Sequence, residues 1–483
     1  MSLFRTKPIS ELQAEATAEH GYKRTLGPIS LISLGIGSVV GAGIFVQAGQ
    51  SSALYAGPAI ALSFVFAGIS CLFAGLCYAE LASMIPVSGS AYTYTYGSLG
   101  EFLAWVVGWC LVLEYLFSGA AVAVSWSGAT RDILHEFNLA LPKYLASAPL
   151  DVVDGRLVTT GALINFPAVF ISLLLTYILY IGIKESANFN NLMVIIKVGV
   201  LLALVGYGIW YFFGHREAVM ANWTPFVPAN TGTFGEFGWS GIFRGAGAIF
   251  FAYVGFDCVS AAAQETKNPQ RDLPIGLLGT LLAVSFLFIS VSLVLTGMVH
   301  YTKLNVDAPF IFALQQVQAP VYFRYLIEAA TLAGLTSVIL VSLLGQPRIF
   351  YAMARDGLLP AYFAKIHPKY GTPHITTWIT GISCAIISGL FPLNVLGELV
   401  SIGTLLAFSL VCAGVLVLRR TQPNLPRPFR TPWVPVIPVL GVITCVVQMN
   451  ALPSITWINL AIWLGIGFVI YFGYSRKHSK LAK

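Results

Sequence analysis

Charged residues are scarce in this sequence. Asp, Glu, Lys and Arg make up 10% of its 483 residues, whereas an ordinary soluble domain carries about 25%. Such a chain cannot cover a water-facing surface, so we expect lipid to be its solvent. The net charge of +7 does not indicate a nucleic-acid partner, because the charges fall in short clusters between apolar runs, as loop charges do in multi-span proteins.

Residues that would build a metal site or a catalytic cluster are few and scattered. The seven cysteines all lie in apolar runs without a CxxC pair, which is typical of small core residues. The seven histidines lie mostly in loops, so nothing indicates an enzyme, a metal or a cofactor. No polar ring or filter indicates a channel. No cleavable signal is evident, because the first 25 residues are polar and charged.

Long apolar runs, in contrast, fill the chain, which is 57% hydrophobic. A transmembrane helix needs about 20 apolar residues. The runs therefore predict an all-α integral membrane protein with twelve transmembrane helices, at 29–50, 58–84, 101–126, 161–183, 189–213, 241–263, 274–299, 325–352, 374–393, 394–419, 433–452 and 455–475. Most of the 27 lysines and arginines fall on the side of the N-terminus. This bias predicts a multi-pass protein of the plasma (inner) membrane with both termini in the cytoplasm.

The first and sixth runs share glycine clusters. The first contains LGIGSVVGAGIF and the sixth contains RGAGAIFFAYVGF. On the first run alone, close helix packing through Gly37 and Gly41 is an equal alternative. Two glycine-interrupted runs at equivalent places predict an inverted repeat with broken helices and a site between them. Repeats of five spans, at 29–213 and 241–419, would cross the membrane in opposite senses because five is odd.

The predicted break in the first run would expose both kinds of backbone group. Amides at Gly41, Ala42 and Gly43, at the start of the second half-helix, suit a carboxylate. Carbonyls at Val39 and Val40, at the end of the first half-helix, suit an ammonium group. A site that holds both poles is one for an amino acid.

The sixth run would supply the opposite wall of the site. Carbonyls at Phe251, Ala252 and Val254 can accept from the ammonium group, and the Phe251 ring can cover the substrate as a gate. Asp257, which follows them, is favoured as an N-cap of the second half-helix over a direct substrate contact.

Lys197 and Glu114 are the ionisable residues expected to carry protons. A lysine within a span costs about 2.5–3.5 kcal/mol on insertion scales, so such residues usually face a cavity. The alternative for Lys197 is snorkelling to the interface. An ammonium near the first break can replace a sodium ion, and its deprotonation on burial would couple transport to protons. Glu114, in the middle of the third run, is an equal candidate.

Three further features remain open to two interpretations each. Thr336 and Ser337 would be ligands of a sodium site, although hydroxyls in spans more often bond their own backbone. Arg244 is expected to be a snorkelling anchor. Charged residues of the loop 264–276, among them Arg271, are either a solvated connection or an inner gate made of ion pairs.

Five long passages resemble the amino acid–polyamine–organocation superfamily, in its cationic amino acid transporter branch and of bacterial type. They are GIGSVVGAGIFV (35–46), YAELASMIPVSGSAYTYTYGSLGE (78–101), NNLMVIIK (190–197), FFAYVGFDCVSAAAQETKNPQRDLPIG (250–276) and LLGQPRIFYAMARDGLLP (343–360). The resemblance runs in register from about residue 23 to 420. It implies a five-plus-five inverted repeat of the leucine-transporter type, with spans one and six unwound.

The resemblance also implies roles for individual residues. It implies that Val39 to Gly43 and the stretch Phe251, Ala252, Tyr253 and Val254 contact the substrate backbone, with Phe251 as the occluding aromatic. Lys197 would stand where sodium sits in sodium-coupled relatives. Two positions depart from the family: Ala42 replaces a usual threonine or serine, and Gln264 replaces a usual glutamate.

Together these features predict a proton-coupled amino acid transporter that works by alternating access on a small neutral L-amino acid. A cationic amino acid transporter or an amino acid/amine exchanger is the alternative, and a sodium-coupled carrier or a channel is the alternative from another class. We expect a cytoplasmic segment at 1–28, a transport core at 29–420, and two accessory helices with a basic tail at 421–483. The expected partners are the amino acid, protons and the bilayer.

Overall fold

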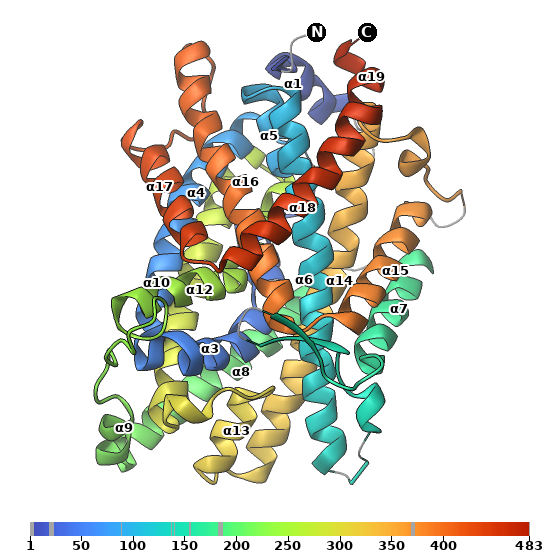
Figure 1. The fold of residues 1–483 in the computed structure, drawn as a ribbon. Helices are drawn as coiled ribbons and strands as arrows, with labels where there is room; N and C mark the ends of the chain where they lie inside the picture. The colour runs from blue at the N-terminus through green and yellow to red at the C-terminus, as the bar shows by residue number, and fades with distance from the viewer. Residues whose placement is uncertain are drawn as a thin grey trace.

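The computed structural model describes residues 4–482 apart from 19–23, 88, 137, 140, 154–155, 182–186 and 369–371. This part of the chain is mostly helical (Figure 1), with one two-stranded antiparallel sheet of β1 (Leu150–Val153) and β2 (Arg156–Thr159). Eight helical segments in it are long and apolar enough to cross a membrane, and four further apolar helices are shorter. The prediction of a helical membrane protein is therefore confirmed.

Each predicted run contains an apolar helix. In chain order these are α2 (Pro28–Val39), α4 (Ile60–Met84), α6 (Glu101–Glu136), α7 (Phe166–Ile181), α8 (Ala187–Gly214), α10 (Gly238–Ile249), α12 (Pro269–Met298), α14 (Val321–Arg355), α15 (His374–Leu390), α16 (Leu393–Thr421), α17 (Val436–Asn450) and α18 (Ser454–Ile470). Shorter helices between them are α1 (Ile9–Ala18), α3 (Ala48–Ser51), α5 (Ser90–Ser98), α9 (Arg216–Asn222), α11 (Cys258–Ala261), α13 (Pro309–Gln316) and α19 (Arg476–His478).

Several predicted boundaries were wrong by a turn or more. The third helix, α6, continues to Glu136, well past the predicted end at 126. The fourth, α7, begins only at Phe166, directly after Asn165, whose Oδ1 accepts from the Ala168 amide at 3.4 Å. The ninth and tenth runs, which are nearly contiguous in sequence, form two helices separated by Phe391 and Pro392. Proline has no backbone N–H, so it ends the ladder of α15 and begins a new helix.

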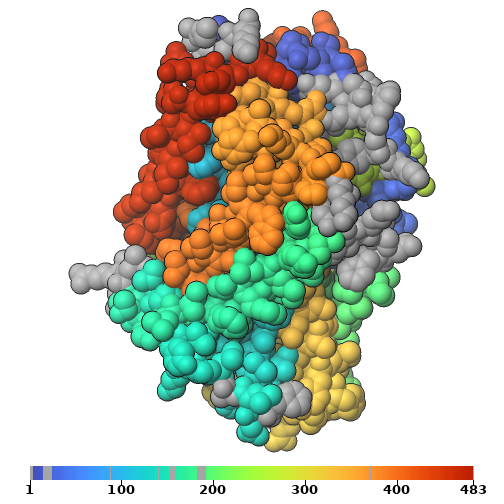
Figure 2. Space-filling model, turned by 90° about the vertical axis from the view of Figure 1, so that its right-hand side faces the viewer, coloured from blue at the N-terminus to red at the C-terminus, as the bar shows by residue number. Residues whose placement is uncertain are grey.

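Small residues bring the helices close together. A Cβ at Gly75 of α4 would lie 2.5 Å from Leu281 Cδ1 of α12, and one at Gly381 of α15 would overlap Thr176 of α7. Close backbone approach at small residues is the usual packing of helices in lipid. Figure 2 shows the outer face on which α7 lies along α14 and α15.

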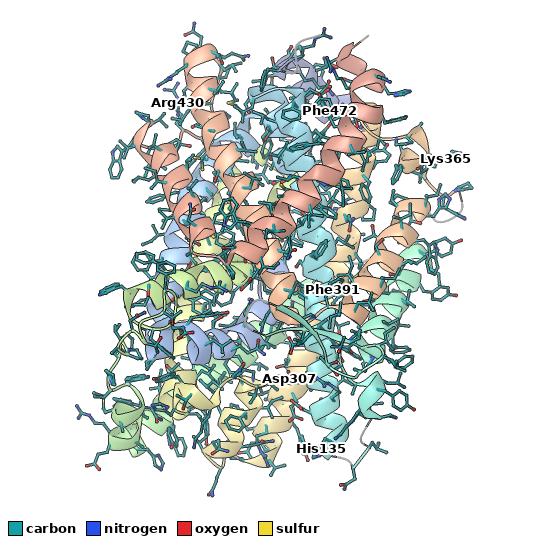
Figure 3. All side chains as sticks on the ribbon, viewed as in Figure 1. His135, Asp307, Lys365, Phe391, Arg430 and Phe472 are labelled. Atoms are coloured by element: carbon teal, nitrogen blue, oxygen red, sulfur yellow. The ribbon has the colours of Figure 1, made fainter. Side chains whose placement is uncertain are left out.

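The outer surface is apolar along the middle of the molecule and charged at its ends. Large side chains such as Phe213 (79% exposed) and Phe286 (71% exposed) point outward from the helices. Arg430 and Lys365 lie toward one end, and Asp307 and His135 toward the other (Figure 3). This distribution fits a bilayer around the middle of the molecule.

Both chain ends lie at the same end of the molecule (Figure 1). Arg5 Nη1 donates to the Leu481 carbonyl at 2.7 Å, and Lys7 pairs with Asp356 at 2.9 Å. The N-terminal segment therefore contacts both the C-terminal segment and the loop that follows α14.

Candidate substrate site between two interrupted helices

The first span is interrupted where the glycines predicted it. Helix α2 ends at Val39, Val40 is extended (φ −75°, ψ 97°), and helical structure resumes with Ala42 and the π-turn Gly43–Gln47. The first amides of any helix have no intrahelical acceptor. The amides at Gly41 and Ala42 therefore stand at a helix start that favours an anion.

The sixth span is interrupted as well. Helix α10 ends at Ile249 and is followed by the 3₁₀ turn Phe250–Tyr253, after which Val254 is extended (φ −60°, ψ 136°). Gly255 then adopts a φ of +103°, which only glycine enters without strain. The short helix α11 begins at Cys258. Both stretches, 29–50 and 241–263, are thus broken rather than continuous.

The two breaks face each other. A Cβ at Gly43 would overlap the Cα of Ala252, so the backbones touch there. Ser38 Oγ, just before the first break, lies 2.7 Å from Cys258 Sγ, just after the second break. All nine predicted contact residues are buried here: Val39, Val40, Gly41, Ala42, Gly43, Phe251, Ala252, Tyr253 and Val254.

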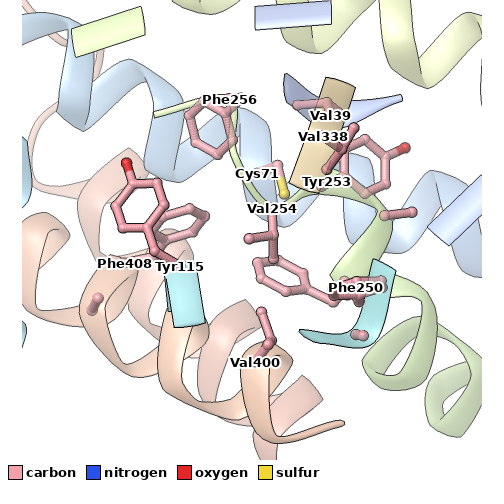
Figure 4. Packing of buried hydrophobic residues seen from close by; sticks show 14 of the residues in the cluster. Val39, Cys71, Tyr115, Phe250, Tyr253, Val254, Phe256, Val338, Val400 and Phe408 are labelled. Atoms are coloured by element: carbon pink, nitrogen blue, oxygen red, sulfur yellow. The ribbon is translucent and has the colours of Figure 1, made fainter. Parts of the chain in front are cut away.

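The side chains around the broken sixth span are mostly apolar. Figure 4 shows Val254 on this segment with Val39 and Val338 on one side and Val400 on the other. The Tyr253 ring points away, and its hydroxyl donates to the Phe64 carbonyl at 3.0 Å. Tyr253 can therefore contribute only its backbone to a site between the breaks.

Lys197 reaches the first break from α8. Its side chain is 1% exposed, and Nζ donates to the Gly37 carbonyl at 2.9 Å and to the Val40 carbonyl at 3.3 Å. Its stem lies 3.5 Å from the position that a Cβ on Gly334 of α14 would take. The snorkelling alternative is wrong, because the amine points to the carbonyl end of α2 instead of the membrane interface.

Glu114 and Asp257 meet in the interior. Glu114, on α6, accepts from Thr404 Oγ1 at 2.9 Å, and Asp257 accepts from Ser90 Oγ at 3.4 Å. The two carboxyl groups are close enough to interact electrostatically. Their second oxygens, Oε1 and Oδ1, have no N–H or O–H donor among the described residues.

Asp257 occupies the predicted N-cap position, but the predicted capping hydrogen bond is wrong. Asp257 does precede α11, but its side chain makes no capping hydrogen bond. Its carboxyl group accepts from Ser90 instead and lies near Glu114. The sequence could not show this pairing, because Glu114 and Asp257 are brought together only by the packing of α6 against the broken span.

The hydroxyls considered as sodium ligands bond their own helix. Thr336 Oγ1 donates to the Leu332 carbonyl at 2.7 Å, and Ser337 Oγ donates to the Gly334 carbonyl at 2.9 Å. This is the common behaviour of such residues within spans. The stem of Lys197, on α8, lies beside Gly334, whose carbonyl accepts from Ser337.

Arg244 is not the snorkelling anchor that the sequence predicted. It is 8% exposed, forms a salt bridge with Glu398 of α16, and lies 4.5 Å from the centre of the Tyr55 ring. Glu398 also accepts from Thr456 of α18 at 2.7 Å. The salt bridge ties α10 to α16, and the carboxylate within the apolar run 394–419 is the feature of the sequence that could have indicated it.

The ion pairs at the end that carries both termini differ from those expected. None of Glu265, Lys267, Arg271 and Asp272 forms a salt bridge with another described residue. Instead, Glu80 of α4 accepts two hydrogen bonds from Arg419, at 2.9 and 2.8 Å, and one from Arg427 at 3.1 Å. Glu80 lies inside the apolar run 58–84, which marks it as unusual in sequence.

Comparison with known proteins decides the family. The family model described as "Amino acid permease" matches residues 26–473. The chain belongs to this family. The resemblance to the amino acid–polyamine–organocation superfamily is thereby confirmed, and the permease is a membrane transporter, not an enzyme.

Its relatives carry different substrate names. The permease is 44% identical to the branched-chain amino acid permease BcaP of Bacillus subtilis (strain 168), over 99% of both chains. It is equally 44% identical, over the full length of both chains, to the methylthioribose transporter of the same organism. A vacuolar cationic amino acid transporter 4 of Arabidopsis thaliana is 36% identical over 88% of this chain and 68% of its own.

Proposed function

We propose that this permease is a proton-coupled transporter that binds the backbone of a small neutral L-amino acid between its two broken spans. The observation that carries the proposal is the position of Lys197, whose Nζ lies on the carbonyls of Gly37 and Val40. A cation fixed at this place does the work of a bound metal ion and can itself gain or lose a proton. The family membership supports the transport of amino acids.

The substrate poles would be held by backbone groups of the two breaks. The carboxylate would bind the amides of Gly41, Ala42 and Gly43, at the positive end of a half-helix. The ammonium would bind the carbonyls of Val39 and Ala252. Val40 and Phe251 contribute less to it than their positions predict, because the Val40 carbonyl already accepts from Lys197 and the Phe251 carbonyl from the Val254 amide at 3.2 Å.

The side chain of the substrate is proposed to be neutral and aliphatic. Val39, Val338 and Val400 lie around Val254 of the broken sixth span, and the four side chains form an apolar surface (Figure 4). A cationic side chain would need a carboxylate among these four residues, and all four are valines. The printed substrates of the two relatives at 44% identity differ, so similarity alone does not choose between them.

Two groups are candidates for the transported proton. Lys197 would change between ammonium and amine at the first break. The contact between Glu114 and Asp257 favours a second route, because two adjacent buried carboxyls cannot both ionise and would share one proton. Phe251, which is 5% exposed, would close over the substrate before the proton and the amino acid are released together.

The proposed architecture is a core of two inverted five-span repeats at 29–420, with α17 and α18 as accessory helices and a tail in 421–483. The two breaks, in the first and sixth spans, support this symmetry. Trp109 of α6 stacks on Trp463 of α18 with ring centres 4.7 Å apart, so an accessory helix packs against the core. The protein is proposed to lie in the plasma membrane. Both termini, including residues 1–28, are proposed to lie in the cytoplasm.

Uptake into proteoliposomes, with proton and sodium gradients imposed separately, tests the proposal. A labelled panel of neutral, cationic and acidic amino acids, with methylthioribose added, would cover the named alternatives. We expect neutral aliphatic amino acids to accumulate with an inward proton gradient alone. Accumulation that requires sodium, or exchange that needs an internal amino acid, would overturn proton symport. The membrane potential contributes about 2.3 kcal/mol per 100 mV for each elementary charge moved, so the potential dependence of uptake also reports the number of charges.

A further inference from the structure

A groove lies at the terminus-bearing end of the molecule, outside the transport path. It has a volume of about 460 Å³ and runs between the first turns of α12 and the segment that follows α16. Its lining combines two polar side chains with apolar ones: Gln270, Arg271, Pro274, Ile275, Leu278, Pro428 and Phe429. None of these residues takes part in the substrate site described above.

The mouth of the groove carries positive charge without a compensating carboxylate. Arg271 lines it and is exposed, and Arg430 follows the lining residue Phe429. Neither arginine forms a salt bridge with another described residue. The neighbouring carboxylate, Asp272, is buried and accepts from the Asn268 amide at 3.2 Å. An anion is therefore the ligand that this mouth favours.

The floor of the groove continues as an apolar stripe along α12. Ile275 is 40% exposed, Leu282 is 62% exposed and Phe286 is 71% exposed. With Leu278, these residues lie three to four positions apart, so they share one face of the helix. Since α12 is one of the helices long and apolar enough to cross a membrane, this face extends from the groove into the hydrocarbon region.

We propose that the groove binds one anionic glycerophospholipid from the leaflet on the side of the two chain ends. Its phosphate would pair with Arg271, and one acyl chain would follow Ile275, Leu278, Leu282 and Phe286. A soluble acidic peptide does not fit this combination, because the apolar half of the site lies where lipid surrounds the helix. A zwitterionic lipid would fill the stripe but leave Arg271 without a net negative partner.

The test uses the purified full-length permease in mixed micelles. A phosphatidylglycerol probe with a photoreactive acyl chain is compared with a phosphatidylcholine probe that carries the same chain, and labelled peptides are mapped. We expect the phosphatidylglycerol probe to label α12 between 275 and 289 at least five-fold more strongly than the phosphatidylcholine probe. Equal labelling by both probes would overturn the proposal.

Two variants and one control connect the labelling to this groove. Arg271→Gln removes the charge, and Leu278→Trp fills the groove without changing charge, so each should reduce the α12 label several-fold. Lys477→Gln, an exposed cation of α19 at the same end of the molecule, should keep it. Full labelling of Arg271→Gln and Leu278→Trp would contradict the site, as would loss of the label in excess inorganic phosphate, which would indicate a simple phosphate site.

Discussion

At the scale of single residues, the buried amine of Lys197 and the contact between Glu114 and Asp257 distinguish this site from a packed helical interior. Lys197 donates to the end of α2, where a helix normally leaves its last carbonyls unsatisfied. The residue therefore holds the broken end of the span in place with its charge. Buried carbonyl groups are costly to leave without a hydrogen-bond donor, so removal of the Lys197 amine is predicted to have a large effect.

We predict that Lys197→Ala abolishes gradient-driven accumulation of the amino acid while the protein still folds. The variant loses the donor to the carbonyls of Gly37 and Val40, and it loses a protonatable group at the break. Uptake driven by an inward proton gradient in proteoliposomes measures this, with size-exclusion elution as the check on folding. Lys303→Ala, which changes an exposed lysine, is the control. Full accumulation by Lys197→Ala would make Glu114 the proton carrier.

We predict that Glu114→Gln melts at a higher temperature than Glu114→Ala. The amide of the glutamine can donate one hydrogen bond to the Asp257 oxygen that lacks a donor, as a shared proton would, whereas alanine cannot. Loss of a buried partner of this kind costs about 1–3 kcal/mol. Thermal unfolding in detergent measures the difference. Equal melting temperatures would argue against a direct contact between the two carboxyl groups.

At the scale of elements, the two interruptions fit together as a pair. Backbone lies directly against backbone where Gly43 meets Ala252, and Gly255 has the positive φ that turns the chain toward α11. These contacts leave no room for a side chain at Gly43. The glycines are therefore needed for the approach of the two broken helices as well as for the breaks themselves.

We predict that Gly43→Ala reduces uptake at least ten-fold. The added methyl group would collide with the backbone of Ala252, which cannot move aside as a flexible side chain can. Gly206→Ala, on α8, is the matched control, because a Cβ there meets no described atom within 4 Å. Initial uptake rates at equal amounts of reconstituted protein decide the comparison. Unimpaired uptake by Gly43→Ala would show that the breaks are farther apart during transport.

The elements also show which features the sequence could predict. The breaks, the apolar helices and the burial of Lys197 follow from glycine spacing, run length and the cost of a charge in lipid. The contacts of Asp257 and Arg244 could not be predicted, because they depend on how α6 and α16 pack against the broken spans. Boundaries such as the end of α6 at Glu136 shifted, since apolar composition does not determine where a helix continues beyond the bilayer.

At the scale of the whole molecule, buried ion pairs join helices that are far apart in the sequence. Arg244 of α10 pairs with Glu398 of α16, and Glu80 of α4 pairs with Arg419 and Arg427 at the end that carries both termini. Conformational exchange of the site between the two sides of the membrane would have to alter contacts of this kind, since they connect different helices across the molecule.

We predict that Glu398→Gln lowers the free energy of unfolding by about 3–5 kcal/mol, because it leaves the buried Arg244 charge without a counter-ion. Arg131→Gln, which removes the exposed pair with Asp307, should change it by less than about 1 kcal/mol. Denaturant titration of both variants in the same detergent measures the two effects. Similar small losses would mean that water or another group compensates Arg244.

The central claim, that peptide groups of two broken helices hold both poles of an amino acid, is tested most directly by competition. Uptake of labelled substrate into proteoliposomes would be measured with excess free amino acid, its methyl ester or its N-acetyl derivative. We predict that the free amino acid competes and that both blocked forms fail, because each lacks one charged pole. Competition by either blocked form as strong as that by the free amino acid would contradict the claim.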